Sequence, residues 1–326
     1  SSGTIGVEAT IDVSAAIEAL AVHPDDTRVY LLSRLGGSVL HVHEPATGSL
    51  KTIAMDPWPV EMIVHPGRRE LLVFCQFSST VLVVDLRRDA VVARIDLTRS
   101  GVAPCVTHYL ASLALDEARD RLYVSIPEQG RLVSIDVAGR RVETVASIFD
   151  PISQETDEGT EVGRYQLAVD AADGRLYAWL RDERELRALD ETFAVRSTLR
   201  FRASDFADND FEAHLLALDP AGRRLFVGPH VVSLAGSAPA RVGLLSGVEC
   251  VASTSGEAFL GVEADDDGTI RLRAIDPGTL ETGADLEAAP CQGIVPRVAA
   301  SSGTGEVYLG YMTEARLDVV LRPTAP

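Results

Sequence analysis

The sequence predicts an all-β protein, a seven-bladed β-propeller with four-stranded blades, and three observations support this fold class. A unit of about four short strands recurs with a mean step of about 46 residues, which is typical of propeller blades. The strands are apolar or alternating and are bounded by Gly, Pro and Asp, while helical periodicity of comparable length is absent. The last copy lacks one strand, and the N-terminus can supply it.

Each copy of the repeat starts with an apolar inner strand, followed by a turn that contains Asp, Gly or His-Pro. A second strand carries an aromatic residue, a third ends in Asp in several copies, and a fourth completes the unit. The first apolar residues of the inner strands are Leu20, Met62, Leu113, Leu167, Leu216, Cys250 and Val298. The repeat covers the chain, so we expect residues 1–326 to form a single domain.

The end of the chain indicates how the ring closes. The seventh copy stops after its third strand, at residues 316–322, while residues 4–13 form a strand that belongs to no other blade. Pairing these two segments would complete the last blade and remove two open sheet edges. Seven blades therefore fit the chain better than six or eight.

Composition and charge exclude several classes of protein. The chain is 46% apolar and 24% charged, as expected for a globular core, and it has no apolar run of the roughly 18 residues that a membrane span needs. Its 48 acidic and 30 basic residues give a net charge of −18, which opposes binding to nucleic acid or to an anionic lipid surface. We expect a monomer that binds an unidentified protein or small molecule.

The segment "RLYVSIPEQGRLVSIDVAGRRVETV", residues 121–145, resembles the YVTN-type propeller repeat, in which a Tyr-Val strand leads through a polar turn to a strand ending in Asp. Residues 28–33, 175–179 and 224–228 are similar to its first half. The resemblance spans most of the chain and implies a propeller of the surface-layer, lactonase-like or electron-transfer kind. Because this is a packing motif, it specifies the fold rather than a function.

The candidate site lies where outer strands cross to the inner strands of the next blades. In propellers of this kind, these crossings share one face with the loops between second and third strands, around the channel mouth. The crossings at residues 149–166 and 202–214 are long and rich in carboxylates. The candidate ligand-binding residues at the channel end of the inner strands are Glu18, Glu61, His108, Tyr109, Arg164, Tyr165, Gln166, His214, Glu249 and Arg297.

Two metal hypotheses follow from these positions, each with a simpler alternative. Asp208, Asp210 and Glu212 could bind calcium, which takes oxygen ligands from irregular loops, or they could form a solvated acidic rim. His108 and His214 could share a metal across the channel, or they could belong to a hydrated lining with ion pairs. No other cofactor is expected. His23 and His65 stand where the repeat elsewhere uses Asp, so we expect them to cap turns.

The cysteines bear on the compartment. Cys75 and Cys105, and likewise Cys250 and Cys291, fall in neighbouring positions on the channel-mouth face, which predicts two disulfides between adjacent blades. Disulfides favour an extracytoplasmic protein, so we expect a periplasmic, secreted or surface-anchored protein whose export signal is absent from this chain. The alternative is four free thiols that act as small apolar side chains.

Three functions are compatible with the sequence. A non-catalytic binding or scaffold propeller needs no catalytic constellation, and no nucleophile elbow, P-loop or zinc-type spacing is found. A lactonase-like or metal-dependent hydrolase would use Glu61 or Glu249 as base or metal ligand, with an arginine stabilising an oxyanion. An electron-transfer subunit has the least support, since nothing in the sequence binds a redox centre. The binding function requires the fewest assumptions.

Overall fold

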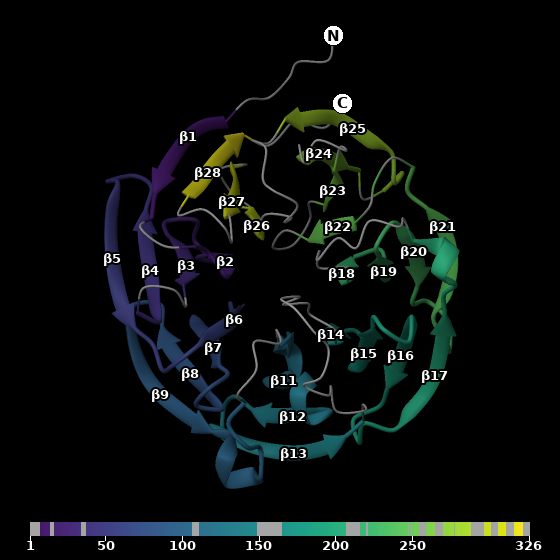
Figure 1. Ribbon diagram of the computed structural model, residues 1–326, viewed down its shortest axis with the longest axis horizontal. Coiled ribbons are helices and arrows are strands. Elements are labelled where there is room, and N and C mark those ends of the chain that lie inside the picture. The colour runs from purple at the N-terminus through teal and green to yellow at the C-terminus, as the bar shows by residue number, and fades with distance from the viewer. Residues whose placement is uncertain are drawn as a thin grey trace.

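The computed structural model is a ring of seven four-stranded antiparallel sheets about a common centre (Figure 1). It describes residues 7–13, 16–33, 37–105, 111–148, 165–206, 216–219, 221–246, 248, 250–253, 259–264, 270–276, 278–287, 297–300, 306–310 and 316–321. The predicted fold class and blade number are confirmed. Within these residues no helix is long and apolar enough to cross a membrane.

The blades follow chain order, each from its inner to its outer strand. Blade 1 contains β2 (Ala19–Val22), β3 (Val29–Ser33), β4 (Val39–Glu44) and β5 (Ser49–Ala54). Blade 2 contains β6 (Pro59–His65), β7 (Glu70–Cys75), β8 (Thr80–Asp85) and β9 (Ala90–Asp96). Blade 3 contains β10 (Leu113–Asp116), β11 (Arg121–Ile126), β12 (Arg131–Asp136) and β13 (Arg141–Ser147). Blade 4 contains β14 (Tyr165–Asp170), β15 (Arg175–Leu180), β16 (Glu185–Leu189) and β17 (Val195–Arg200).

The remaining blades complete the ring. Blade 5 contains β18 (Leu216–Asp219), β19 (Arg224–Val227), β20 (His230–Ser233) and β21 (Ala240–Leu244). Blade 6 contains β22 (Cys250–Ser253), β23 (Phe259–Ala264), β24 (Ile270–Ile275) and β25 (Thr282–Glu287). Blade 7 contains β26 (Arg297–Ala300), β27 (Glu306–Gly310), β28 (Arg316–Leu321) and, outermost, β1 (Val7–Asp12). Short 3-10 helices are η1 (Leu97–Ser100), η2 (Glu117–Arg119), η3 (Pro127–Gln129) and η4 (Ala203–Asp205).

The ring is closed by the two ends of the chain, as predicted. β1 pairs antiparallel with β28, with Thr10 opposite Asp318 and Ile11 opposite Leu317. The Thr10 hydroxyl donates a hydrogen bond of 2.8 Å to the Asp318 carboxylate. In Figure 1 the purple β1 lies beside the yellow β28. The described strand is shorter than the expected 4–13, because residues 1–6 lie outside the described part.

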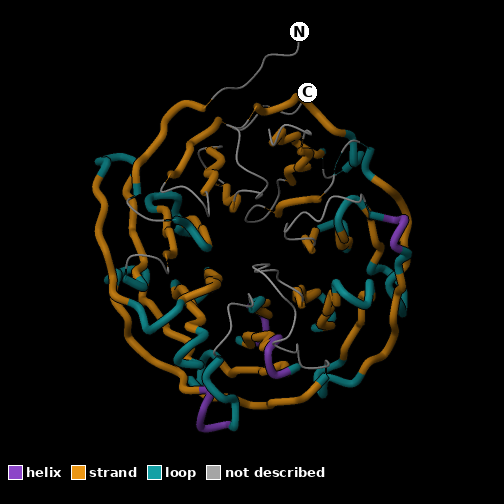
Figure 2. The backbone as a smooth tube through the Cα atoms, in the orientation of Figure 1, coloured by secondary structure: helices purple, strands orange, loops and turns teal. Residues whose placement is uncertain are grey.

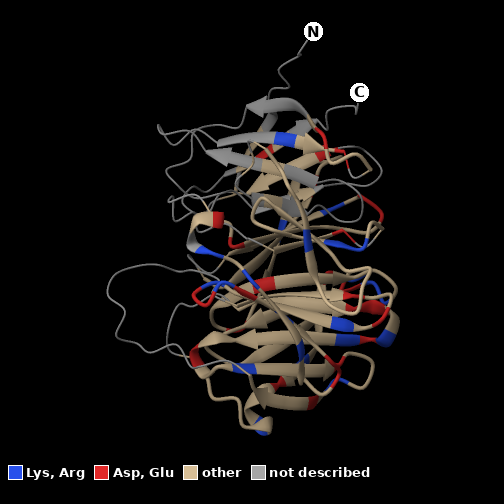
Figure 3. Ribbon diagram, turned by 90° about the vertical axis from the view of Figure 1, so that its right-hand side faces the viewer, with Lys and Arg blue, Asp and Glu red and all other residues tan. Residues whose placement is uncertain are grey.

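In Figure 2, teal loops and turns join the orange strands around the ring. The strand order places these connections on two different faces. The crossing face carries the crossings to each next inner strand, such as residues 55–58 and 97–105, and the loops between second and third strands, such as 76–79, 127–130 and 181–184. The hairpin face carries the turns between first and second strands and between third and fourth strands. In the edge-on view of Figure 3, blue and red segments lie close together along many of the turns.

Side-chain alternation along the strands builds the core between adjacent blades. Adjacent residues of a second strand face opposite sides of the sheet. In β11, Leu122 packs in the cluster shared with blade 2, while the next residue, Tyr123, packs in the cluster of Leu167 of blade 4. Tyr177 likewise packs against Leu225 of blade 5. The aromatic residue of the repeat is therefore a contact to the following blade, which explains its recurrence.

The predicted turn caps are confirmed for the aspartates. Asp170 accepts a hydrogen bond from the Ala172 amide at 3.0 Å, and Asp219 accepts one from the Gly222 amide at 2.9 Å. His23 Nδ1 accepts from the Asp25 amide at 3.2 Å, which is the same kind of turn capping. His65 differs, because its Nε2 lies 2.8 Å from Asp120 Oδ1 and so links blade 2 to blade 3.

The predicted disulfide between Cys75 and Cys105 is wrong, since both residues are buried free thiols. Cys75 packs in the cluster between blades 1 and 2, whereas Cys105 packs in the cluster between blades 2 and 3. Both lie near the crossing face, yet alternation along β7 directs Phe74 towards blade 3 and Cys75 towards blade 1. The blade 2 sheet therefore lies between the two thiols. The predicted pair of Cys250 and Cys291 cannot be compared, because Cys291 is outside the described residues.

Candidate binding site on the crossing face

Some predicted site residues fall within the described part. Glu18 precedes β2, Glu61 lies in β6, Tyr165 and Gln166 begin β14, and Arg297 begins β26. The other candidates lie outside the described residues; these are His108, Tyr109, Arg164, His214 and Glu249, and the proposed calcium ligands Asp208, Asp210 and Glu212. The described ranges contain no group of three or more His, Cys, Asp and Glu side chains that could hold a metal ion.

The described candidates differ in how far a ligand could reach them. Glu18, Tyr165 and Gln166 are buried, with exposed fractions of 1%, 3% and 6%. Glu61 is half-buried, and its carboxylate accepts a hydrogen bond of 3.0 Å from the Met62 amide. The first three side chains therefore belong to the base of the crossing face, and Glu61 is the one that retains contact with solvent.

Two serines hold the start of β14 against blade 3. The Ser125 hydroxyl donates to the Tyr165 carbonyl at 3.1 Å and accepts from the Ser112 amide at 2.8 Å. The Ser112 hydroxyl in turn accepts from the Leu167 amide at 3.1 Å. Since these bonds satisfy buried backbone groups of two inner strands, they fix the position of Tyr165 in the ring.

The clearest feature of the crossing face is an aromatic pair that the sequence analysis missed. Trp58, in the crossing from blade 1 to blade 2, stacks on Phe77 of the β7–β8 loop, with ring centroids 4.6 Å apart and an interplanar angle of 7°. Both side chains are partly exposed. Stacked aromatic pairs of this kind add about 0.5–1.5 kcal/mol beyond the area they bury. The pair thus presents a pre-formed apolar surface beside the inner strand of blade 2.

The backbone of Trp58 is held in an unusual conformation. Its φ is 62°, in the left-handed region that bulky residues rarely adopt. The Trp58 amide donates to the Ser38 hydroxyl at 3.2 Å, and its carbonyl accepts from the Gln76 amide at 2.8 Å. Loops of blades 1 and 2 therefore both hold this residue in place. Backbone strain that is maintained by neighbouring contacts is common at functional sites.

A chain of polar contacts supports the loops beside the pair. Arg94 Nε donates to Asp56 at 3.1 Å, and Asp56 accepts from the Thr80 hydroxyl at 3.0 Å. The Thr80 hydroxyl also lies 2.7 Å from that of Ser78, which directly follows Phe77. These contacts join the crossing that carries Trp58 to the loop that carries Phe77. The two aromatic residues are thus positioned by separate but linked segments.

A sequence signal for this pair existed. The chain has only two Trp residues, and Trp58 stands between two prolines in "DPWP", in a crossing rather than in a strand. Trp179, the other one, is 1% exposed within β15, as expected of a core residue. A Trp in a short crossing is therefore the residue type and place that would have predicted a binding surface.

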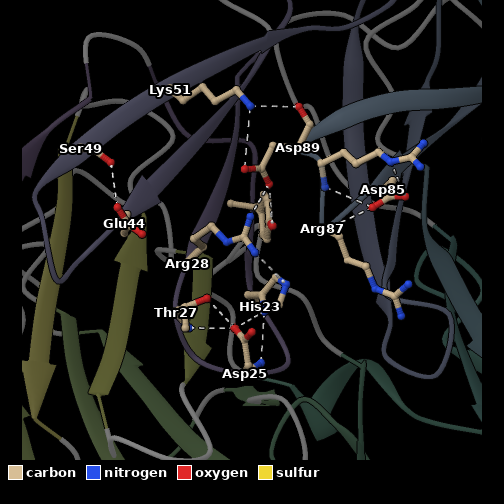
Figure 4. Close-up of polar contacts among 12 residues, drawn as sticks. His23, Asp25, Thr27, Arg28, Glu44, Ser49, Lys51, Asp85, Arg87 and Asp89 are labelled. Atoms are coloured by element: carbon tan, nitrogen blue, oxygen red, sulfur yellow. Dashed lines mark hydrogen bonds and ion pairs between the residues drawn. The ribbon is translucent and has the colours of Figure 1, made fainter.

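The hairpin face is instead occupied by ion pairs between blades (Figure 4). Arg28 of blade 1 contacts Asp89 of the blade 2 turn at 2.7 Å, and Tyr30 donates to the same carboxylate at 3.3 Å. At the equivalent positions one blade on, Glu70 pairs with Arg140 of the blade 3 turn, with Nη1 to Oε2 at 3.1 Å. The two interfaces thus form an ion pair at the same place, with the acidic and basic partners exchanged between the two blades. Because these groups are paired with one another, this face offers fewer contacts to a partner.

Comparisons with known proteins identify a fold and no family. The ring of seven sheets and the core between them define the protein as a β-propeller. Its terminal strands close the ring. No family model and no curated protein matches the sequence. Among solved structures, a chain in the crystal structure of a mitotic checkpoint complex is similar, with a TM-score of 0.70 over 98% of this chain and 92% of that chain. At a sequence identity of 14%, this similarity shows a shared fold and does not indicate a shared function.

Proposed function

We propose that this protein is a non-catalytic binding propeller that recognises a protein partner on the crossing face. The observation that carries the proposal is the stacked pair of Trp58 and Phe77, which is partly exposed and rigidly held. Aromatic side chains with fixed geometry are the usual anchors of protein interfaces, because they bury a large area at small entropic cost. The structural likeness to a chain of a protein complex supports the same function.

The net charge suggests the chemistry of the partner. A charge of −18 attracts basic surfaces and repels acidic ones over long distances. A partner that inserts an apolar or aromatic residue against Trp58 and presents basic residues around it would complement this face. Glu61 is the half-buried carboxylate of the adjacent inner strand and would be a contact for such a basic residue.

Selection from a random peptide library displayed on phage, against the immobilised protein, tests the proposal without a known partner. We expect recovered peptides to be rich in aromatic and basic residues and to bind Trp58→Ala at least about tenfold more weakly, the effect of a modest hot spot. Trp58→Phe, which keeps an aromatic ring, should lose less. Val242→Ala, on the outer strand of blade 5, is the control and should bind normally.

Two results would contradict the proposal. One is the recovery of peptides that bind Trp58→Ala and Phe77→Ala as well as they bind the unaltered protein. The other is a selection with no enrichment above that on an unrelated protein. Circular dichroism melts of each variant would show that lost binding does not come from lost structure.

A lactonase-like hydrolase of the YVTN-repeat kind is the second candidate. Its support is the repeat in residues 121–145 together with Glu61, a carboxylate on an inner strand that keeps contact with solvent. Hydrolysis of a panel of lactones with and without calcium would test it, and Glu61→Gln should then abolish turnover. The proposed location outside the cytoplasm now has support only from the Cys250 and Cys291 pair, because Cys75 and Cys105 are free.

A further inference from the structure

Two histidines lie at the seam between blades 7 and 1, where the ring closes. On β4, His41 is paired with Leu31 and His43 with Val29. Paired residues of neighbouring strands project to the same side of a sheet. Val29 and Leu31 pack against Leu317 of β28, so both imidazoles face the blade that contains the two ends of the chain.

These imidazoles are buried with few hydrogen bonds. The exposed fractions of His41 and His43 are 5% and 4%. Neither ring nitrogen of His41 has a hydrogen-bond partner, and Nδ1 of His43 has none either. Among the histidines of the described ranges, His41 is the one with both nitrogens unbonded; His65 and His230, for example, each use Nε2. A buried polar group without a partner costs about 1–3 kcal/mol.

The equivalent positions of the next two blades are aliphatic. Leu82 and Val84 occupy them in blade 2, and Val133 and Ile135 in blade 3, all with exposed fractions of 0%. The fold therefore does not require histidine at these positions. In blade 1 two imidazoles replace the apolar pair, at the seam that depends on strands from opposite ends of the chain.

We propose that the seam between blades 7 and 1 is an acid-sensitive latch, in which protonation of His41 and His43 opens the closure of the ring. A neutral imidazole is tolerated in this apolar setting, whereas an unpaired buried imidazolium is not. Opening the seam would expose its apolar surface and remove the packing that holds β1 and β28 against blade 1, so the β1–β28 ladder would be weakened as well. The ring would then switch between a closed and an open form with pH.

Burial acts on the pKa of both imidazoles and a backbone hydrogen bond at Ser49 acts on that of His43, while no carboxylate is among the causes for either. The residues that face the seam from β3 and β28 are apolar, and Asp318 bonds Thr10 on the β1–β28 ladder, where alternation turns it away from Leu317 and Val319. From β27, the Tyr308 hydroxyl donates to Glu306 at 2.6 Å at the turn end of the seam. From β5, Lys51 lies 3.9 Å from Asp89, on the blade 2 side.

The direction of the pH effect follows from burial. Burial lowers the pKa of both His41 and His43 below the ordinary value of 6.5, and a backbone hydrogen bond at Ser49 opposes this only for His43. A group with a lowered folded pKa binds its proton preferentially in the open state. The stability of the seam is therefore complete above about pH 6.5 and decreases as the pH falls below it.

Hydrogen–deuterium exchange at about pH 7.5 and about pH 5.5, corrected for intrinsic rates, tests the latch. We expect peptides of β1, β3, β4 and β28 to exchange severalfold faster at the lower pH, because the open state binds the protons of both histidines more strongly. Peptides of β11 and β12 in blade 3 should change little. The double variant H41L/H43V, which carries the residues of blade 2, should lose the pH effect.

His65→Asn is the matched control, because it removes a histidine from a turn in which blades 3 to 5 carry Asp, and Asn can cap such a turn without placing a second carboxylate beside Asp120. It should keep the pH effect of the unaltered protein. The proposal is overturned if exchange accelerates equally in all blades, if it does not depend on pH, or if H41L/H43V still responds. Should the double variant not fold, urea unfolding of the unaltered protein decides instead: a free energy of unfolding that is no lower at about pH 5.5 than at about pH 7.5 contradicts the latch.

Discussion

At the scale of single residues, burial determines the reactivity of the free thiols Cys75 and Cys105. Burial raises the pKa of the Cys75 and Cys105 thiols to about 12 in each case. Cys105 also accepts a contact of 3.7 Å from the Gln129 amide, which holds it beneath the β11–β12 loop. At neutral pH neither thiol forms the reactive thiolate to any useful extent.

We therefore predict that Cys75 and Cys105 resist alkylation in the native protein. Iodoacetamide labelling at neutral pH, followed by peptide mass spectrometry, should find both residues unmodified without denaturant and fully modified in guanidinium. The denatured sample is the control for reagent and digestion. Recovery of a peptide that links the two cysteines, or rapid labelling of either one in the native state, would contradict the assignment.

Some residue roles could be predicted from the sequence and others could not. The Asp and aromatic positions of the repeat were predictable because each recurs at a fixed place and has one physical role, turn capping or contact to the next blade. The position of Cys75 at the end of β7 was predictable, but the disulfide prediction considered only that both cysteines lie near the crossing face. It left out the alternation along β7, which directs Cys75 towards blade 1. Trp58 was missed because it lies in a crossing, outside the repeat.

At the scale of elements, neighbouring blades are joined by one ion pair in two orientations. Arg28 with Asp89 joins blades 1 and 2, and Glu70 with Arg140 joins blades 2 and 3. We predict that Arg140→Asp destabilises the protein by about 1–2 kcal/mol, because the largely buried Glu70 would face a like charge. Urea unfolding at neutral pH would measure the loss.

The compensating variant makes this prediction specific. Glu70→Arg added to Arg140→Asp reproduces the arrangement of the preceding interface and should recover part of the loss. Recovery should be incomplete, because Arg68 lies 3.2 Å from Glu70 and would then face a second arginine. Arg88→Asp, in the exposed turn of blade 2, is the control and should change stability by less than about 0.5 kcal/mol. A purely additive double variant would show that the two residues do not interact.

For the whole molecule, the strand order predicts that stability depends on the first thirteen residues. Deleting residues 1–13 removes β1, exposes the edge of β28 and removes Val13, which is 0% exposed. We expect a loss of more than about 2 kcal/mol, since burial of one Val is worth about that much, and a tendency to self-associate through the new edge. Thermal melts and light scattering would measure the two effects.

A shorter deletion is the control for the closure of the ring. Removing residues 1–6 alone leaves β1 and its ladder with β28 intact, so neither the stability nor the oligomeric state should change. If both truncations melt like the full chain, the N-terminal strand does not close the ring in solution. The sequence could predict this closure because it follows from counting strands, whereas the contact of Trp58 with Phe77 involves residues outside the repeat.

The β1–β28 ladder also determines when the ring can close during synthesis of the chain. Thr10 and Asp318 are 308 positions apart, so β1 has no partner until β28 leaves the ribosome. At roughly 5–20 residues per second, this wait is on the order of 15–60 seconds. During that interval six blades can assemble while β1 remains without its ladder. A second nascent chain that supplied its own β28 first would yield an interlinked dimer, so the speed of translation and the spacing of ribosomes on the message become determinants of how much single-chain ring is produced.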